Sequence, residues 1–166
     1  TATGIAAAGA ASAAARFESD QIGASLGVSV ASAGDIDGDE FSDLIVGAPD
    51  YDGSQADEGA AFVFRGSATG IASAGPAGAA AQLSGGQLNA LFGSSVAAAG
   101  DVNGDLFGDA VVGAPNFDAG QTNEGAAFVF LGSASGIESA SSAAAHAQLE
   151  GDQAGAVLGI SVASAG

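Results

Sequence analysis

Four aspartates in one nine-residue segment are the residues of this 166-residue chain whose types and spacing are best suited to chemistry. Positions 1, 3, 5 and 9 of the segment are occupied by Asp35, Asp37, Asp39 and Asp43. Gly38 allows the sharp turn that would aim these side chains at one point. Such an oxygen cluster suits Ca²⁺, which takes about six to eight oxygen ligands, better than Mg²⁺, which requires strict octahedral geometry. The carbonyl of Phe41, at position 7, is the usual further ligand in loops of this type.

The same spacing occurs a second time. Its positions 1, 3, 5, 7 and 9 are Asp101, Asn103, Asp105, Phe107 and Asp109. We therefore predict two Ca²⁺ sites, one in each copy. They are not EF-hands, because Val46 and Val112 stand at position 12, where an EF-hand has Glu. The alternative is that both segments are solvated Asp-Gly turns without metal.

Both loops belong to an internal duplication with a period of 66 residues. Residues 35–100 and 101–166 share 39 identities in 66 aligned positions, which chance does not produce. Residues 1–34 form a partial third copy. The duplication predicts four units: residues 1–23 as a partial repeat with an outer strand, 24–89 and 90–155 as complete repeats with one Ca²⁺ loop each, and 156–166 as the first strand of a further repeat.

Each complete repeat reads as four short strands separated by turn signals. The first is predicted over 26–33 and 92–99, with a terminal counterpart at 158–165. The second, at 44–46 and 110–112, ends before a Gly-Ala-Pro turn, since proline removes a ladder donor. The third is predicted over 60–64 and 126–130, and the fourth over 81–83 and 147–149, with a counterpart at 15–17. The Ala-rich stretch 6–15 leaves a short helix open.

Repeated four-stranded antiparallel units are typical of β-propeller blades, so we predict an all-β chain with two complete blades and terminal partial strands. A linear β-solenoid is the alternative. Within strand three, Phe62 and Phe64 share one face, as do Phe128 and Phe130, and we expect these faces to pack against a neighbouring blade.

Composition and charge exclude several classes of function. The chain has 2 Lys+Arg against 19 Asp+Glu, a formal net charge of −17, so it lacks the cations a nucleic-acid binder needs. It has no Cys for disulfides or thiolate metal sites, and no apolar run long enough for a transmembrane helix. Because Met is absent, we expect a processed chain or a piece of a longer one.

The sequence predicts no enzyme. It contains no Cys nucleophile and no Lys base. The single histidine, His146, has alanine in the other copies and reads as an incidental surface residue. A carboxylate pair for glycoside hydrolysis is conceivable at Asp50 and Asp52. That second acidic segment, 50–58, is interpreted as a solvated loop, because half of its charge is lost in the other copy.

The motif order Phe92-Gly93, Asp101-Val102-Asn103-Gly104-Asp105, Asp109 and Gly113-Ala114-Pro115 resembles the FG-GAP repeat of integrin α-subunit propellers and their bacterial relatives. The resemblance covers about residues 18–166. In the first copy Leu26 replaces the motif phenylalanine, and the last copy stops before its loop. The resemblance implies propeller blades with Ca²⁺ bound between strands one and two, in an extracellular and mostly adhesive or structural family.

We therefore expect a secreted or cell-surface, calcium-stabilised structural or adhesive module. Two complete blades do not close a propeller, so we expect self-association or further blades of a longer parent, as a filament or as part of an adhesin. The alternatives are a carbohydrate-binding propeller, with Tyr51 and Phe117 as aromatic platform, and a non-catalytic accessory domain of a secreted enzyme. A glycan or protein ligand is compatible with either. Nucleic acid is excluded as a partner.

Overall fold

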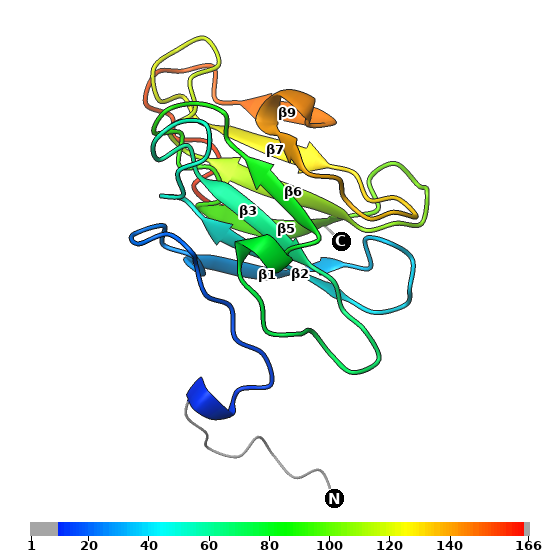
Figure 1. Cartoon of the computed structure of the whole chain (residues 1–166). Coiled ribbons are helices and arrows are strands. Elements are labelled where there is room, and N and C mark those ends of the chain that lie inside the picture. Colours follow the sequence, from blue (N-terminus) through cyan, green and yellow to red (C-terminus); the bar gives the residue numbers. More distant parts are fainter. Residues whose placement is uncertain (1–9, 165–166) are drawn as a thin grey trace, which may run out of the picture.

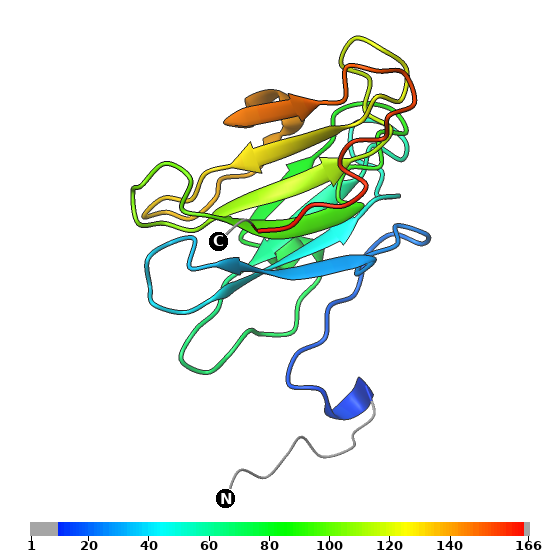
Figure 2. The same cartoon turned by 180° about the vertical axis from the view of Figure 1, so that it is seen from behind.

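The computed structural model describes residues 10–164, and the strands within them form two sheets, one from each complete repeat (Figures 1 and 2). The first sheet consists of β1 (Ser29–Gly34), β2 (Asp43–Ala48), β3 (Ala60–Phe64) and β4 (Ala81–Ser84), with the short β8 (Ala140–Ser141) of the second repeat added beside β4. The second consists of β5 (Ser95–Gly100), β6 (Asp109–Ala114), β7 (Ala126–Phe130) and β9 (Ala147–Glu150). The four strands of each repeat pair antiparallel with their neighbours, so the prediction of four-stranded antiparallel blades is confirmed.

The strand boundaries follow the predicted ones with two systematic differences. Strand two continues two residues past its predicted end in both blades, so Gly47-Ala48 and Gly113-Ala114 belong to the strand, which ends only at the following proline. Strand three has the predicted bounds in both blades, whereas strand one begins three residues later than predicted. The reason is the glycine at its predicted start. Gly27 and Gly93 have φ angles of +93° and +88°, which an extended strand does not allow.

The flanking segments differ from prediction. Residues 158–164 were expected to be a strand, but the described part forms only an isolated parallel bridge between Leu158 and Gly125. Residues 15–17 likewise form only a bridge, from Phe17 to Ala74. In both complete blades, strand one pairs with strand two and strand four pairs with strand three. The sequence contains no such partner strand for residues 158–164 or for residues 15–17. Residue 165 lies outside the described residues.

Both bridges nevertheless repeat contacts found between the two blades. The Gly125–Leu158 bridge reproduces the Gly59–Phe92 bridge 66 residues earlier. The Phe17–Ala74 bridge corresponds to the parallel pairing of Leu83 in β4 with Ala140 in β8 (Ala140–Ser141). The flanking segments therefore lie where parts of adjoining blades would lie.

The described residues contain three short 3₁₀ turns. They are η1 (Ala10–Ser12), η2 (Pro76–Gly78) and η3 (Ser142–Ala144). The helix left open for 6–15 is thus one turn over 10–12, and residues 6–9 lie outside the described part.

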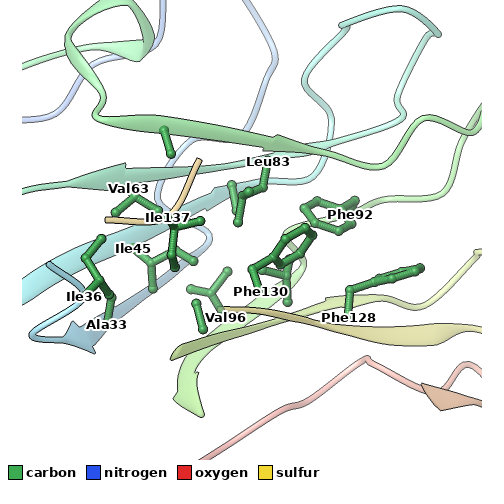
Figure 3. Close-up of a cluster of buried hydrophobic side chains, with 14 of the residues drawn as sticks. Ala33, Ile36, Ile45, Val63, Leu83, Phe92, Val96, Phe128, Phe130 and Ile137 are labelled. Atoms are coloured by element: carbon green, nitrogen blue, oxygen red, sulfur yellow. The ribbon is translucent and has the colours of Figure 1, made fainter. Parts of the chain in front are cut away.

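The main hydrophobic core lies between the two blades (Figure 3). The Phe92 ring is fully buried there, with its centroid 5.7 Å from Phe128 and 6.1 Å from Phe130. The first blade contributes Ile36, Ile45, Val63 and Leu83, all with no exposed surface. The prediction that Phe128 and Phe130 pack against a neighbouring blade is therefore confirmed.

The corresponding aromatic face of the first blade is also covered. Phe62 and Phe64 are 0% and 3% exposed. They pack in a separate cluster with Phe17, Ala24 and Leu26 from the segment before β1. The ring centroids of Phe17 and Phe64 lie 4.5 Å apart. This segment therefore fills part of the place that a preceding blade would occupy.

Small residues allow the blades to approach closely. A Cβ placed on Gly47 in β2 would lie 2.0 Å from the carbonyl oxygen of Gly93. Gly113 in β6 has the same relation to Gly159, at 1.9 Å. The glycine of each Gly-Ala-Pro segment is thus required by contact with the following repeat. This explains why so much of the core consists of Ala and Gly.

Candidate metal-binding loops

The first acidic loop connects β1 to β2 and is organised by Asp35. One carboxylate oxygen of Asp35 accepts hydrogen bonds from the amides of Gly38, at 2.7 Å, and Asp39, at 3.0 Å. The other oxygen accepts from Glu40 at 2.9 Å. A bulge between Ser32 and Gly34 immediately precedes the loop and turns the chain out of the ladder.

This arrangement brings three of the four predicted carboxylates of the first loop together. Asp35, Asp37 and Asp39 each offer an oxygen, and these oxygens all lie within 4.8 Å of one another. The side chain of Asp37 is only 7% exposed, and its Oδ1 is buried without a hydrogen-bond partner in the structure. A buried carboxylate oxygen without a partner is energetically costly, so this atom is suited to binding a cation.

Asp43 has a different environment at the base of the loop. It is 2% exposed, and its Oδ2 accepts from the amide of Ile36 at 2.9 Å while its Oδ1 accepts from Gly66 at 2.7 Å. Burial raises the pKa of Asp43 above its ordinary value, and the nearby charges of Asp37 and Asp39 add to the rise. Asp43 thus joins the start of the loop to the segment after β3.

The second loop, between β5 and β6, has the same backbone pattern. Asp101 accepts hydrogen bonds from Gly104 at 2.7 Å, from Asp105 at 3.0 Å and from Leu106 at 2.9 Å. These bonds, that from Leu106 first, hold the pKa of Asp101 below its usual range. The position-3 residue is Asn103, whose Nδ2 donates to Asp105 Oδ2 at 2.8 Å.

Asp109 is the counterpart of Asp43 in the second loop. It is fully buried and accepts from the amides of Val102 and Gly132, both at 2.8 Å. Both position-9 aspartates therefore bond the backbone of their own blade. Whether they also reach a cation, as predicted, stays a prediction, as do the Phe41 and Phe107 carbonyl ligands.

The two loops differ in what surrounds them. The second blade braces the first loop: Gly108 donates its amide to the Asp35 carbonyl at 2.7 Å, and Ser133 donates to the Ile36 carbonyl at 3.1 Å. A Cβ on Gly38 would lie 2.9 Å from the Phe107 ring. The second loop has no equivalent brace within residues 10–164, because its counterparts would belong to a third repeat.

Sequence reasoning missed Arg65, whose positive charge lies beside the first loop. Arg65 Nε lies 3.2 Å from Asp37 Oδ2. The pairing of Leu44 with Phe64 brings the residue after β3 next to the loop before β2, so the antiparallel order could have suggested this contact. The duplication gave no help, because the other copy has Leu131 at this position.

The interpretation of 50–58 as a solvated loop is wrong for its last residue. Glu58 is 2% exposed, and its two oxygens accept from the Ser54 amide at 2.9 Å and the Ser54 hydroxyl at 2.8 Å. Its counterpart Glu124 is 1% exposed and accepts from Ala119 at 2.7 Å and Gln121 at 3.0 Å. Both glutamates fix the loop before strand three. Asp52, by contrast, is exposed.

The proposed aromatic platform is also wrong. Tyr51 is 9% exposed and packs edge-on against Phe62, with ring centroids 5.2 Å apart. Phe117 packs in the same way against Phe128, at 5.0 Å. Tyr51 is therefore buried, and Phe117, which is partly buried, is held edge-on against the core. His146 is exposed, in agreement with the prediction of a surface residue.

Comparison with known protein families identifies the repeat that contains the acidic loop. The family model for the FG-GAP repeat matches residues 26–64 and 92–130, which include strands one to three and the loop of each blade. The chain carries two FG-GAP repeats. The prediction of this family is confirmed.

The curated proteins to which the chain is similar include integrin α subunits. The chain is 33% identical over 126 residues to integrin alpha-V of Gallus gallus, covering 73% of this chain and 11% of that protein. It is 36% identical over 130 residues to integrin alpha-IIb of Mus musculus, covering 74% and 12% respectively. The chain thus spans about a tenth of the length of these relatives. Among residues 10–164, no helix is long and apolar enough to cross a membrane.

Proposed function

We propose that this FG-GAP chain is an extracellular, calcium-stabilised structural or adhesive module that assembles with further blades or with other copies of itself. It has no catalytic role in this proposal. The similarity to integrin α subunits supports the extracellular assignment. The proposal joins two features of the molecule, the acidic loops and an apolar face of the second blade that the chain covers only in part.

The residues of the first loop fit Ca²⁺. The cluster offers only oxygens, its carboxylates lie within 4.8 Å of one another, and Asp37 Oδ1 is buried without a partner. Asp35, Asp37 and Asp39 would hold the ion, and the Phe41 carbonyl and Asp43 are proposed to complete the set. A bound divalent cation would neutralise carboxylates that otherwise repel one another within the chain's charge of −17.

The second loop is proposed to bind Ca²⁺ with Asp101, Asn103 and Asp105, and with the Phe107 carbonyl and Asp109 completing the set. Amide oxygens are ordinary Ca²⁺ ligands, so the Asn103 substitution is compatible with the site. The matching backbone pattern around Asp101 supports this assignment. The first loop should bind more tightly, because the second blade braces it and a braced loop loses less entropy on binding.

The observation that carries the assembly proposal is an apolar face on the second blade that this chain covers only in part. In the first blade, Ile36 and Leu83 have no exposed surface, because the second blade covers them. Their counterparts Val102 and Leu149 are 52% and 53% exposed. Leu158 and Val162 pack only beside the inner part of this face, near Val111.

An apolar surface that the repeat buries at one blade and exposes at the next favours a further blade as its partner. A second copy of the chain presents such a blade. The strand predicted over 158–165 would then be completed by that partner. No observation favours the carbohydrate-binding alternative, since Tyr51 is buried and Phe117 packs, partly buried, against the core.

Sedimentation velocity of the chain in Ca²⁺ tests this proposal. We expect concentration-dependent association of the wild-type chain, and loss of association in Leu149→Glu. Ile22→Glu, at a fully exposed position before β1, is the matched control and should associate normally. A wild-type chain that stays monomeric at high concentration would refute self-association.

A further inference from the structure

Arg65 forms the ion pair of the first loop. Its Nε lies 3.2 Å from Asp37 Oδ2, and the Asp37 side chain is 7% exposed. The pairing uses one oxygen of Asp37 and leaves Oδ1 without a partner. The position-3 carboxylate is therefore held from outside the loop while its other oxygen stays free.

The guanidinium group is also fixed from its far side. Its Nη2 donates a hydrogen bond to the carbonyl of Ser135 in the second blade. Gly136, the next residue, also lies close to this nitrogen, since a Cβ placed on it would be 2.9 Å away. Arg65 therefore has a defined position between the first loop and the second blade, although the side chain as a whole is 46% exposed.

The second repeat lacks both members of this ion pair. Asn103 replaces Asp37, and Leu131 replaces Arg65. Counted over loop positions 1, 3, 5 and 9, the first loop carries four carboxylates and the second carries three. Adding the positive charge of Arg65 to the first loop gives both loops a net charge of −3. The exposed Glu40, at position 6, is outside the ligand positions and is screened by water.

We propose that Arg65 is an internal counter-ion of the first loop: it offsets the additional charge of Asp37 and thereby sets the Ca²⁺ affinity of that loop. This rests on the proposed function, namely that the loop binds Ca²⁺. Arg65 acts through Asp37 and through the field at the site, so it is a tuning residue and no ligand. The Asp37–Arg65 pair carries the same net charge as the Asn103–Leu131 pair.

The proposal predicts opposite effects for the two single exchanges. Arg65→Leu removes a positive charge near the ion and should tighten Ca²⁺ binding at the first loop roughly three- to tenfold, given an effective dielectric near that of water. Asp37→Asn should weaken binding by about tenfold or more, because it removes a ligand charge and leaves Arg65 uncompensated. The double variant copies the second repeat and should return to within roughly threefold of the wild-type affinity.

Calorimetric titration with Ca²⁺ measures these affinities in a background with Asp105→Ala, which disables the second loop so that heat comes from the first. Melting temperatures are recorded in parallel in chelator and in Ca²⁺. Arg65→Leu should lower the melting temperature in chelator, where Asp37 loses its partner, and increase the rise that Ca²⁺ produces. Arg65→Lys, which keeps the charge, should retain the wild-type affinity.

The outcomes separate this inference from the proposed function. If the background protein binds no Ca²⁺, the calcium proposal itself fails. If it binds Ca²⁺ but Arg65→Leu leaves the affinity unchanged or weakens it, the counter-ion role is wrong and Arg65 only positions Asp37 or clamps the blades. A purely structural clamp would also lower the melting temperature equally with and without Ca²⁺.

Discussion

Replacing Asp43 by Ala should destabilise the chain strongly even in the absence of metal. Asp43 is 2% exposed and accepts two backbone hydrogen bonds, from Ile36 at 2.9 Å and from Gly66 at 2.7 Å. In Asp43→Ala both amides are left without an acceptor in a buried place. Each unsatisfied amide costs about 1–3 kcal/mol, which gives about 2–6 kcal/mol for the pair.

Two effects place the expected loss in the lower half of that range. The wild-type carboxylate bears a cost of burial, which raises its pKa, and removing the charge recovers part of that cost. A small side chain also leaves room for local relaxation. We therefore expect a decrease of about 2–4 kcal/mol in the free energy of unfolding, a large share of the roughly 5–15 kcal/mol typical of a domain.

Urea unfolding followed by circular dichroism, in excess chelator, measures this difference. Asp39→Ala is the control, because Asp39 is exposed. The Phe41 amide, which donates a hydrogen bond to Asp39, can bond to water in the variant. The substitution should cost less than about 1 kcal/mol. Asp109→Ala should behave like Asp43→Ala, since the same two bonds recur in the second blade. A loss below about 1 kcal/mol in Asp43→Ala would refute the view that Asp43 anchors the loop.

Three further changes test packing, close approach and titration. Phe92→Ala should cost about 3–5 kcal/mol, because its ring is fully buried between the blades, whereas Val28→Ala, at a 63% exposed position, should be nearly neutral in the same calorimetric scan; equal effects would contradict the core described here. Gly47→Ala should cost about 1–3 kcal/mol or more, because its Cβ would meet the Gly93 carbonyl at 2.0 Å, while Gly120→Ala, whose nearest neighbour is at 3.8 Å, should be tolerated in urea unfolding. In chelator, the stability that protonated Asp43 contributes should be present below pH 3.8 and be lost as the pH rises through its raised pKa. The stability that ionised Asp101 contributes should be present above pH 3.8 and be lost as the pH falls through its lowered pKa. Melting curves of Asp43→Ala and Asp101→Ala against pH separate the two, and identical profiles would show that neither carboxyl is perturbed as described.

The duplication made the blades predictable. Two copies of one pattern fix the order of strands and turns, and strand three was predicted to the residue because its alternation of Phe and Val has no glycine to interrupt it. Strand one was predicted too long, because positive φ angles at Gly27 and Gly93 are compatible with the same apolar pattern. The terminal strands failed for a different reason, since a strand requires a partner and theirs lie in other repeats.

The candidate metal-binding loops also have a part that the sequence predicts and a part that it does not. The spacing of the aspartates was sufficient to place Asp35, Asp37 and Asp39 together, because neighbours in one tight loop cannot be far apart. The buried hydrogen bonds of Asp43 and Glu58 depend on how each loop folds against its blade, which no local pattern specifies. The Arg65 contact joins a residue that the repeats do not share to a loop 28 residues earlier in the sequence, so only the sheet topology reveals it.

The most direct test of the central claim is a calorimetric titration of the purified, chelator-treated chain with Ca²⁺. The account predicts two binding events per chain, the loss of the tighter one in Asp39→Ala and of the weaker one in Asp105→Ala, and a higher melting temperature in Ca²⁺ than in chelator. A chain that shows no Ca²⁺ heat and the same melting curve in Ca²⁺ and chelator would contradict it.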